Sequence, residues 1–164
     1  MCYTIFRGDN MYNIVLVEDE KDLNNLIKAY LEKEGYNVTS YYNGTDAINN
    51  IDKPAHLWIL DIMLGDDVSG YDIIKKIREV DTNIPVIFTS ARDKELDKII
   101  GLELGSDDYV TKPYSPKELV LRVNNIIKRV YAKDNKKISY KDYVIDLDKR
   151  MALLNDKDLC YFRI

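Results

Sequence analysis

The stretch IVLVED at residues 14–19 places four apolar residues directly before two carboxylates. The arrangement recurs as LWILD at 57–61, PVIFTS at 85–90 and YVTK at 109–112. Short apolar runs of this kind are typical of strands buried on both faces of a parallel sheet. Such strands end at one edge, where open α/β sheets bind ligands. The polar residues expected at that edge are Glu18, Asp19, Asp61, Ser90 and Lys112.

Amphipathic segments separate the strands. The stripes expected to face inward are Leu23, Leu26, Ile27, Tyr30 and Leu31; Ile73, Ile74, Ile77 and Val80; Leu96, Ile99, Ile100 and Leu104; and Leu119, Val123, Ile126, Ile127 and Val130. A further strand at 37–42 and a short helix at 45–51 complete the order. Gly35 and Gly105 are expected to end helices, and Ser69 and Ser115 to begin them. The alternation over 11–132 predicts an α/β fold, a doubly wound parallel sheet of five βα units with helices on both faces.

The composition is that of an ordinary globular protein with an acidic body. The chain has 164 residues, and its two cysteines, Cys2 and Cys160, have no pairing or metal-binding spacing. No apolar run is long enough for a membrane span, and no signal pattern precedes the first strand, so a cytoplasmic protein is expected. Residues 11–132 hold 21 acidic and 15 basic side chains, which makes this part a poor nucleic-acid surface and a suitable cation site.

The two ends differ from this body. Residues 1–10 show no period and are interpreted as a leader, frayed or added to the protein, before a second methionine at Met11. Residues 133–137 are a polar, lysine-rich linker. In residues 138–164 we expect three short strands, at 138–140, 143–147 and 151–154, which are too few residues for an independent core.

Three carboxylates at one edge require a counter-charge. Glu18, Asp19 and Asp61 would raise each other's pKa unless a cation compensates them. Mg²⁺ is the hard, oxygen-seeking cation that fits such a set. The alternative is three solvated carboxylates at loop ends.

Four stretches in this order resemble the receiver domain of a two-component response regulator. They are VEDE at 17–20, LDIML at 60–64, TSAR at 89–92 and GSDDYVTKP at 105–113. The resemblance implies a flavodoxin-like sheet of order 2-1-3-4-5. It implies that Asp61 accepts a phosphoryl group from the phosphohistidine of a sensor histidine kinase. Mg²⁺ would be held by Asp19, Asp61 and the carbonyl of Met63, with Glu18 acting through water.

The resemblance also implies the phosphate-binding and switch residues. These are Ser90, Ala91, Tyr109, Lys112 and Pro113. Lys112 would pair with the phosphoryl group, and its bond to Pro113 would be cis. Ser90 would donate a hydrogen bond to a phosphoryl oxygen, and Tyr109 would rotate into the space that the moving loop leaves. Such a domain is not an enzyme in the usual sense, although self-phosphorylation from small phosphodonors and autodephosphorylation would be expected of it.

The loop after Asp61 departs from the family pattern. Gly65 stands where the family usually has proline, and Gly70 lies one residue later than expected, so the loop holds one extra residue. Asp66 and Asp67 add charge near the metal. The loop is either a neutral surface variation or a change that affects kinase docking or the lifetime of the acyl phosphate.

The region from the fourth to the fifth helix resembles the winged-helix (OmpR/PhoB-type) subfamily. The implied face of a phosphorylation-dependent homodimer comprises Lys98, Glu103, Asp107, Asp108, Glu118 and Arg122. Lys98 with Glu118, and Asp108 with Arg122, would pair across the subunits. Residues 138–164 would be the partial N-terminal sheet of a winged-helix effector domain. No recognition helix is visible, so DNA would be read only through a portion that this sequence lacks.

Two other functions were weighed. An aspartyl-phosphate hydrolase would need an acid/base aspartate two residues after Asp61, where this chain has Met63. A stand-alone receiver, acting in a phospho-relay or in protein interaction without DNA-binding output, remains open. The main expectation is a phospho-accepting response regulator with transcriptional output.

Overall fold

The computed structural model describes residues 11–91 and 95–131 and four strands beyond them. For residues 95–98 and for those four strands the description covers the backbone only. The first part alternates strands and helices without exception. In chain order the elements are β1 (Asn13–Val17), α1 (Lys21–Lys33), β2 (Asn37–Tyr41), α2 (Gly44–Asn49), β3 (Leu57–Asp61), α3 (Gly70–Val80), β4 (Val86–Ser90), α4 (Glu95–Glu103), β5 (Asp108–Thr111) and α5 (Pro116–Tyr131). The βα order predicted from the apolar runs is therefore confirmed.

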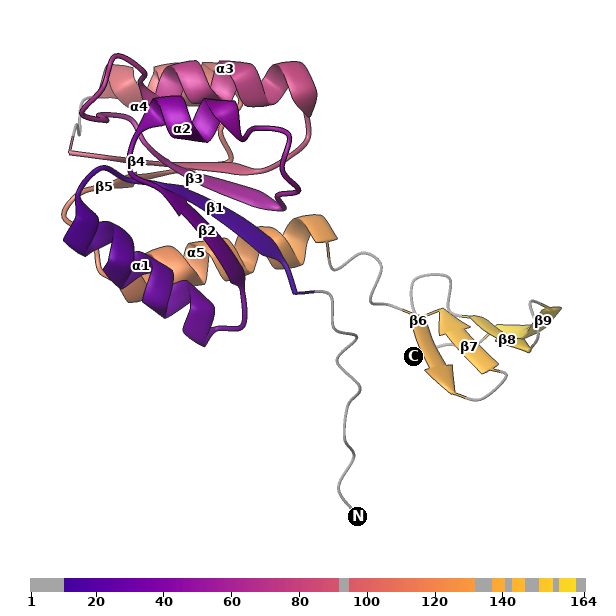
Figure 1. Ribbon diagram of the computed structural model, residues 1–164. Coiled ribbons are helices and arrows are strands. Elements are labelled where there is room, and N and C mark those ends of the chain that lie inside the picture. Colours follow the sequence, from indigo (N-terminus) through magenta and orange to yellow (C-terminus); the bar gives the residue numbers. More distant parts are fainter. Residues whose placement is uncertain are drawn as a thin grey trace. The chain divides into compact units, whose positions relative to one another are not determined.

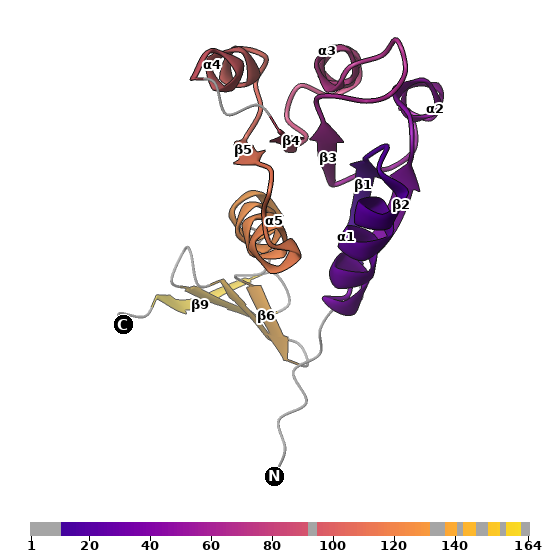
Figure 2. The same cartoon turned by 90° about the vertical axis from the view of Figure 1, so that its left-hand side faces the viewer.

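The five strands form one parallel sheet of order β2-β1-β3-β4-β5, as the family resemblance implied. Helices α1 and α5 lie on one face of the sheet, and α2, α3 and α4 lie on the other (Figures 1 and 2). The chain reverses direction of winding between β2 and β3, because β1 lies between these two strands. Ligand sites of doubly wound sheets form at such a switch point, outside the carboxyl ends of the strands.

Two apolar layers hold the helices on the sheet. Side chains alternate along a strand, so Trp58 and Leu60 face one side and Leu57 and Ile59 the other, and all four are buried. On the α3 side, Trp58 joins Phe88, Ile73 and other buried residues in one cluster. The strands are buried from both faces, which explains their continuous apolar sequence.

The predicted helix stripes are correct in part. Ile27 and Leu31 of α1 are buried, but Leu26 and Tyr30 are 46% and 44% exposed, and Asn24 is buried in their place. Val80 was also predicted to face inward and is 59% exposed at the last turn of α3. Periodicity marks which residues can face the sheet, but it does not show which of them the neighbouring elements cover.

The predicted helix ends agree with the structure. Gly35 and Gly105 follow α1 and α4 with φ of +91° and +81°, the left-handed region that only glycine enters freely. Ser69 accepts a hydrogen bond from the N–H of Asp72, and the Asp72 carboxylate accepts one from the N–H of Ser69, which completes a capping box at α3. Helix α5 begins at Pro116, as predicted.

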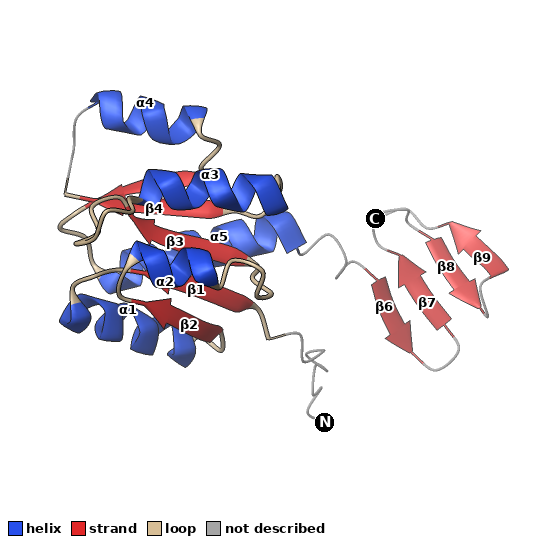
Figure 3. Cartoon of the chain, turned by 45° about the horizontal axis from the view of Figure 1, so that its top comes forward, coloured by secondary structure: helices blue, strands red, loops and turns tan. Residues whose placement is uncertain are grey.

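The described chain forms two compact units that divide within α5, after Asn124. The second unit contains an antiparallel sheet of β6 (Lys137–Tyr140), β7 (Tyr143–Asp146), β8 (Met151–Leu154) and β9 (Lys157–Tyr161), in that order (Figure 3). The sequence predicted three of these strands and missed β9, whose residues KDLCY are too polar to resemble a strand. The last residue of the predicted linker 133–137 is Lys137, which is the first residue of β6.

Among the residues that the structure describes, none of the helices has the length and apolar character needed to cross a membrane.

Candidate functional site

The strand register brings the predicted polar residues to one edge. Val17 lies opposite Leu60, so Glu18 and Asp61, the next residues of β1 and β3, come side by side. Asp61 lies opposite Thr89, and Ser90 lies opposite Thr111. The residue after Thr111 is Lys112, which continues the same row. Four strands therefore bring polar side chains to one edge of the sheet.

The ammonium group of Lys112 is the centre of this polar cluster. It donates to Asp61 Oδ2 at 2.6 Å and to both oxygens of Glu18, at 2.8 Å and 3.0 Å. Glu18 and Asp61 are 1% and 3% exposed. Asp61 Oδ1 accepts the backbone N–H of Met63 at 2.9 Å. Both oxygens of Asp61 are thus held by donors, and its carboxylate has a fixed orientation.

Glu18 is the carboxyl group of the site whose ionisation is disfavoured. Burial raises the pKa of its carboxyl from 4.5 to about 7, helped by the charge of Asp61 and opposed by the hydrogen bond and charge of Lys112. Hydrogen bonds from Lys112 to Asp61 and Glu18 overcome burial and raise the pKa of Lys112 above its ordinary value. One ammonium is therefore shared by two buried carboxylates, and its single positive charge does not neutralise both.

The residues present fit a divalent cation. One oxygen from each of Glu18, Asp19 and Asp61 lies within 4.8 Å of the others. Carboxylate oxygens are the ligands that Mg²⁺ prefers, and a third, exposed carboxylate at Asp19 leaves the cation access to solvent and to its own waters. The site thus has an excess of negative charge that Lys112 alone does not neutralise.

Asn24 supports this edge and was not found by sequence reasoning. Its side chain is fully buried and donates to the carbonyl oxygens of Glu18, at 2.9 Å, and of Tyr41, at 3.1 Å. These carbonyls end β1 and β2, so Asn24 ties both strand ends to α1. In the sequence Asn24 is a polar residue beside the apolar stripe, and its position five residues after Asp19 was the available signal.

Tyr114 is a second neighbour that the sequence analysis did not single out. Burial raises the pKa of its hydroxyl to about 12, and the charges of Glu18 and Asp61 add to the effect. The sequence shows only a tyrosine after Lys112 and Pro113. Its proximity to the carboxylates follows from the turn of the chain between β5 and α5.

The predicted switch residues lie in β4 and β5 or directly after these strands. Ser90 is fully buried at the end of β4, and Ala91 after it is exposed. Tyr109 is partly buried in β5 and packs against the α3-side core. The Lys112–Pro113 bond is cis, as the resemblance implied.

The predicted dimer face has an internal ion-pair network. Arg122 bonds Asp108 at 2.9 Å and Glu118 at 2.8 Å within one chain. Asp107 accepts the N–H of Val86 at 3.0 Å, and Glu103 is exposed. The side chain of Lys98 lies outside the described residues. Ile99 was predicted to face inward but is 45% exposed on α4, and the side chain of Leu96 lies outside the described residues. Leu102 on α4 and Leu121 on α5 are also exposed apolar residues.

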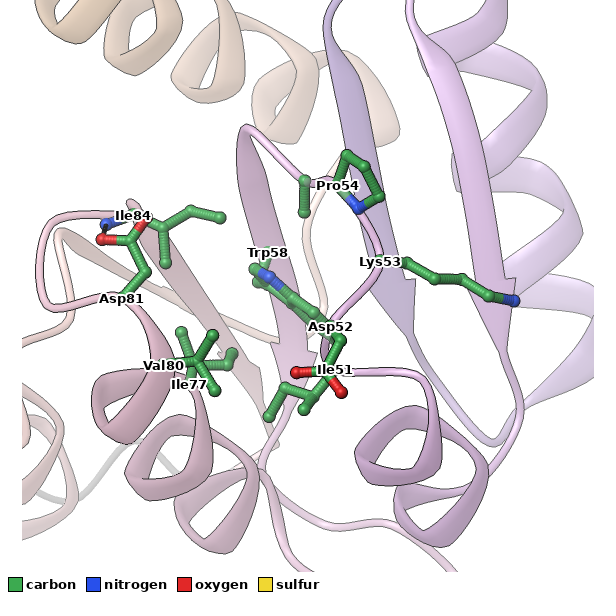
Figure 4. Close-up of a pocket in the computed structure, with 10 residues that line it drawn as sticks. Ile51, Asp52, Lys53, Pro54, Trp58, Ile77, Val80, Asp81 and Ile84 are labelled. Atoms are coloured by element: carbon green, nitrogen blue, oxygen red, sulfur yellow. Dashed lines mark hydrogen bonds between the residues drawn. The ribbon is translucent and has the colours of Figure 1, made fainter.

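A separate cavity of about 180 Å³ lies at the opposite, amino edge of the sheet. Trp58, Ile77 and Ile84 form much of its wall, and Asp52 and Asp81 stand beside them (Figure 4). The carboxylate cluster does not line this cavity. The candidate site is therefore defined by converging polar side chains rather than by this hollow.

The fold and the site together define a doubly wound α/β domain with an acidic cation site at its carboxyl edge. The sequence pattern of the response regulator receiver domain matches residues 14–124, and the chain belongs to this family.

Two curated relatives and one solved structure illustrate the kinship. The chain is 52% identical over 120 residues to the transcriptional regulatory protein CssR of Bacillus subtilis, which covers 73% of this chain and 53% of CssR. It is 44% identical over 120 residues to the response regulator SaeR of Staphylococcus epidermidis, covering 73% and 52%. The crystal structure of the response regulator DrrB, a Thermotoga maritima OmpR/PhoB homologue, matches with a TM-score of 0.67 and 29% identity, over 90% of this chain and 65% of DrrB. The chain spans about half the length of the curated relatives it matches.

Proposed function

We propose that this protein is a phospho-accepting response regulator and that Asp61 is its phosphoacceptor. The observation that carries the proposal is the position of the Asp61 carboxylate, buried and oriented between Lys112 at 2.6 Å and the N–H of Met63 at 2.9 Å. An oxygen of Asp61 attacks the phosphorus of a sensor kinase's phosphohistidine or of a small phosphodonor. The new P–O bond forms as the bond from phosphorus to the donor breaks, and the donor leaves with the electron pair.

Charge neutralisation is the main contribution that this site can make. Glu18, Asp19, Asp61 and the Met63 carbonyl would hold Mg²⁺, which when bound offsets the negative charge of the carboxylates and of the incoming phosphoryl group. Lys112 would release its bond to Asp61 and pair with a phosphoryl oxygen, because its ammonium already lies against the accepting carboxylate. Hydrolysis of the acyl phosphate would follow by attack of water.

The proposed output of phosphorylation is a rearrangement of the β4 and β5 ends. The Ser90 hydroxyl would bond a phosphoryl oxygen, and Tyr109 would turn inward behind the moving loop. The face of α4, β5 and α5 would then form a homodimer. Its arginine, Arg122, is already paired with Asp108 and Glu118 in one chain, so dimerisation requires these bonds to be exchanged across the two-fold axis.

Transcription regulation is the proposed purpose of this switch. The names of CssR and DrrB describe a transcriptional regulator and an OmpR/PhoB homologue, and the match to DrrB covers 90% of this chain. We therefore interpret residues 11–132 as the receiver, 133–137 as the linker and 138–164 as the first sheet of a winged-helix effector domain, acting in the cytoplasm. DNA would be contacted by the remainder of such a domain.

Intact-mass analysis after incubation with acetyl phosphate tests the phosphoacceptor. Wild type with Mg²⁺ should gain one phosphoryl group, and Asp61→Asn should gain none. Asp67→Asn, a substitution of an exposed carboxylate in the following loop, is the matched control and should label as wild type does. Labelling of Asp61→Asn, or labelling of wild type in excess EDTA, would show that the assignment is wrong.

A further inference from the structure

The loop between β3 and α3 is anchored to the start of α2 through Asp66. Its carboxylate accepts the N–H of Thr45 at 3.0 Å, the Thr45 hydroxyl at 3.0 Å and the N–H of Gly44 at 3.3 Å. Partial burial raises the pKa of Asp66, but these bonds and one from the N–H of Val68 outweigh it, so the pKa lies below its ordinary value. The carboxylate is therefore held in its ionised form by residues 21 and 22 positions earlier in the chain.

Close packing reinforces the same attachment. A Cβ atom added to Gly44 would stand 2.6 Å from Cγ1 of Val68 and 2.8 Å from the Val68 carbonyl oxygen. Only a glycine admits the loop at this distance. Asp66 thus binds the start of α2 by hydrogen bonds, and Val68 packs against it. The loop that contains the extra residue is therefore attached to α2 at two positions.

The other side of the loop borders the cation site. A Cβ atom added to Gly65 would stand 3.1 Å from Oδ2 of Asp19. Met63, the source of the carbonyl ligand proposed above, donates its N–H to Asp61. Gly65 is adjacent to Asp66 in sequence, so the anchor at α2 fixes the backbone that lies against Asp19.

We propose that Asp66 is a positioning residue for the divalent-cation site. It attaches the loop to the start of α2 and thereby keeps the exposed carboxylate of Asp19 and the backbone of Met63 in the arrangement that binds the ion. The proposal rests on the proposed function, since it assigns to Asp66 a role in the Mg²⁺ site of that function. It also gives the altered loop a purpose: glycine at position 65 leaves room beside Asp19, and Asp66 supplies the rigidity that glycine lacks.

Calorimetric titration of the unphosphorylated protein with Mg²⁺ tests this role. Asp66→Ala should raise the dissociation constant by about 3- to 10-fold, less than the loss typical of a residue bonded directly to a ligand. Asp67→Ala removes the same charge from the next, exposed residue and measures the electrostatic loss alone, expected to be below about 2-fold. Asp66→Asn keeps an acceptor oxygen for the N–H groups and should fall between wild type and Asp66→Ala.

Amide hydrogen exchange supplies a readout that does not depend on metal. Exchange should accelerate in peptides covering 43–47 and 62–69 in Asp66→Ala and stay at the wild-type rate in Asp67→Ala. Equal Mg²⁺ dissociation constants for the two alanine variants would overturn the positioning role while leaving the metal site intact. Absence of saturable Mg²⁺ binding by wild type would overturn both the metal site and the role of Asp66.

Discussion

Raising the pH should destabilise this protein when divalent cations are absent, because of Glu18. Burial raises the pKa of its carboxyl from 4.5 to about 7 in the folded state. In that pH range the folded protein holds a proton on Glu18 that the unfolded chain has released. The free energy of unfolding therefore falls as the pH rises through this window and levels off above it.

The expected magnitude follows from the size of the pKa difference. Each pH unit within the window costs about 1.4 kcal/mol, so the whole window corresponds to about 3 kcal/mol. Asp66 and Asp72 have lowered pKa values, so their contribution to the free energy of unfolding increases as the pH rises. This increase is complete above their ordinary pKa of 3.8 and does not affect the window of Glu18. Lys112, Tyr36 and Tyr114 have raised pKa values and act only in alkaline solution.

Urea denaturation in EDTA from about pH 5 to about pH 8 measures the effect. Glu18→Gln removes the titrating group and should flatten the profile. Saturating Mg²⁺ should restore stability to wild type above about pH 7, where Glu18 is ionised and able to bind the cation. Identical pH profiles for wild type and Glu18→Gln would refute the reasoning.

Three further outcomes are expected. Asn24→Ala should lower the free energy of unfolding by about 1–3 kcal/mol, because the buried carbonyl of Glu18 loses the Asn24 donor and the carbonyl of Tyr41 keeps only the N–H of Glu18. The exposed Asn25→Ala should change it by less than about 0.5 kcal/mol in urea titrations. A beryllofluoride mimic of the phosphoryl group should dimerise wild type but not Arg122→Glu in light scattering, and equal dimerisation of both would place the interface elsewhere. In fluorescence-polarisation titrations this chain should bind DNA without sequence preference and weakly, since residues 11–132 carry six more acidic than basic side chains; tight, competitor-resistant binding would contradict this.

The succession of strands and helices along the chain and the gathering of the site were predictable because both follow from local signals. The order of the strands within the sheet was implied by the family resemblance instead. A strand that is buried on both faces has a run of apolar residues without polar interruption, so its two ends can be recognised in the sequence. The polar residue that follows each run must then lie at the edge of the sheet. Glu18, Asp61 and Lys112 were found in this way, and in the structure Lys112 bonds both carboxylates.

Features that depend on distant segments were not predictable. The burial of Asn24 depends on two carbonyls from separate strands, and periodicity counts it as a polar residue. The contact of Asp66 with Thr45 joins loops that are apart in sequence, so Asp66 was interpreted only as added charge near the metal. The exposure of Leu26 and Tyr30 shows the same limit, because an apolar stripe wider than the sheet it covers leaves some members in solvent.

Reduction of the phosphorylated protein with borohydride tests the central claim most directly. An aspartyl phosphate is reduced to homoserine, so peptide mass mapping identifies the residue that carried the phosphoryl group. After acetyl phosphate and Mg²⁺ treatment, homoserine is expected at position 61 and at no other aspartate. Homoserine at Asp19 or Asp66, or a phosphoryl mass gain without any reducible aspartate, would contradict the account.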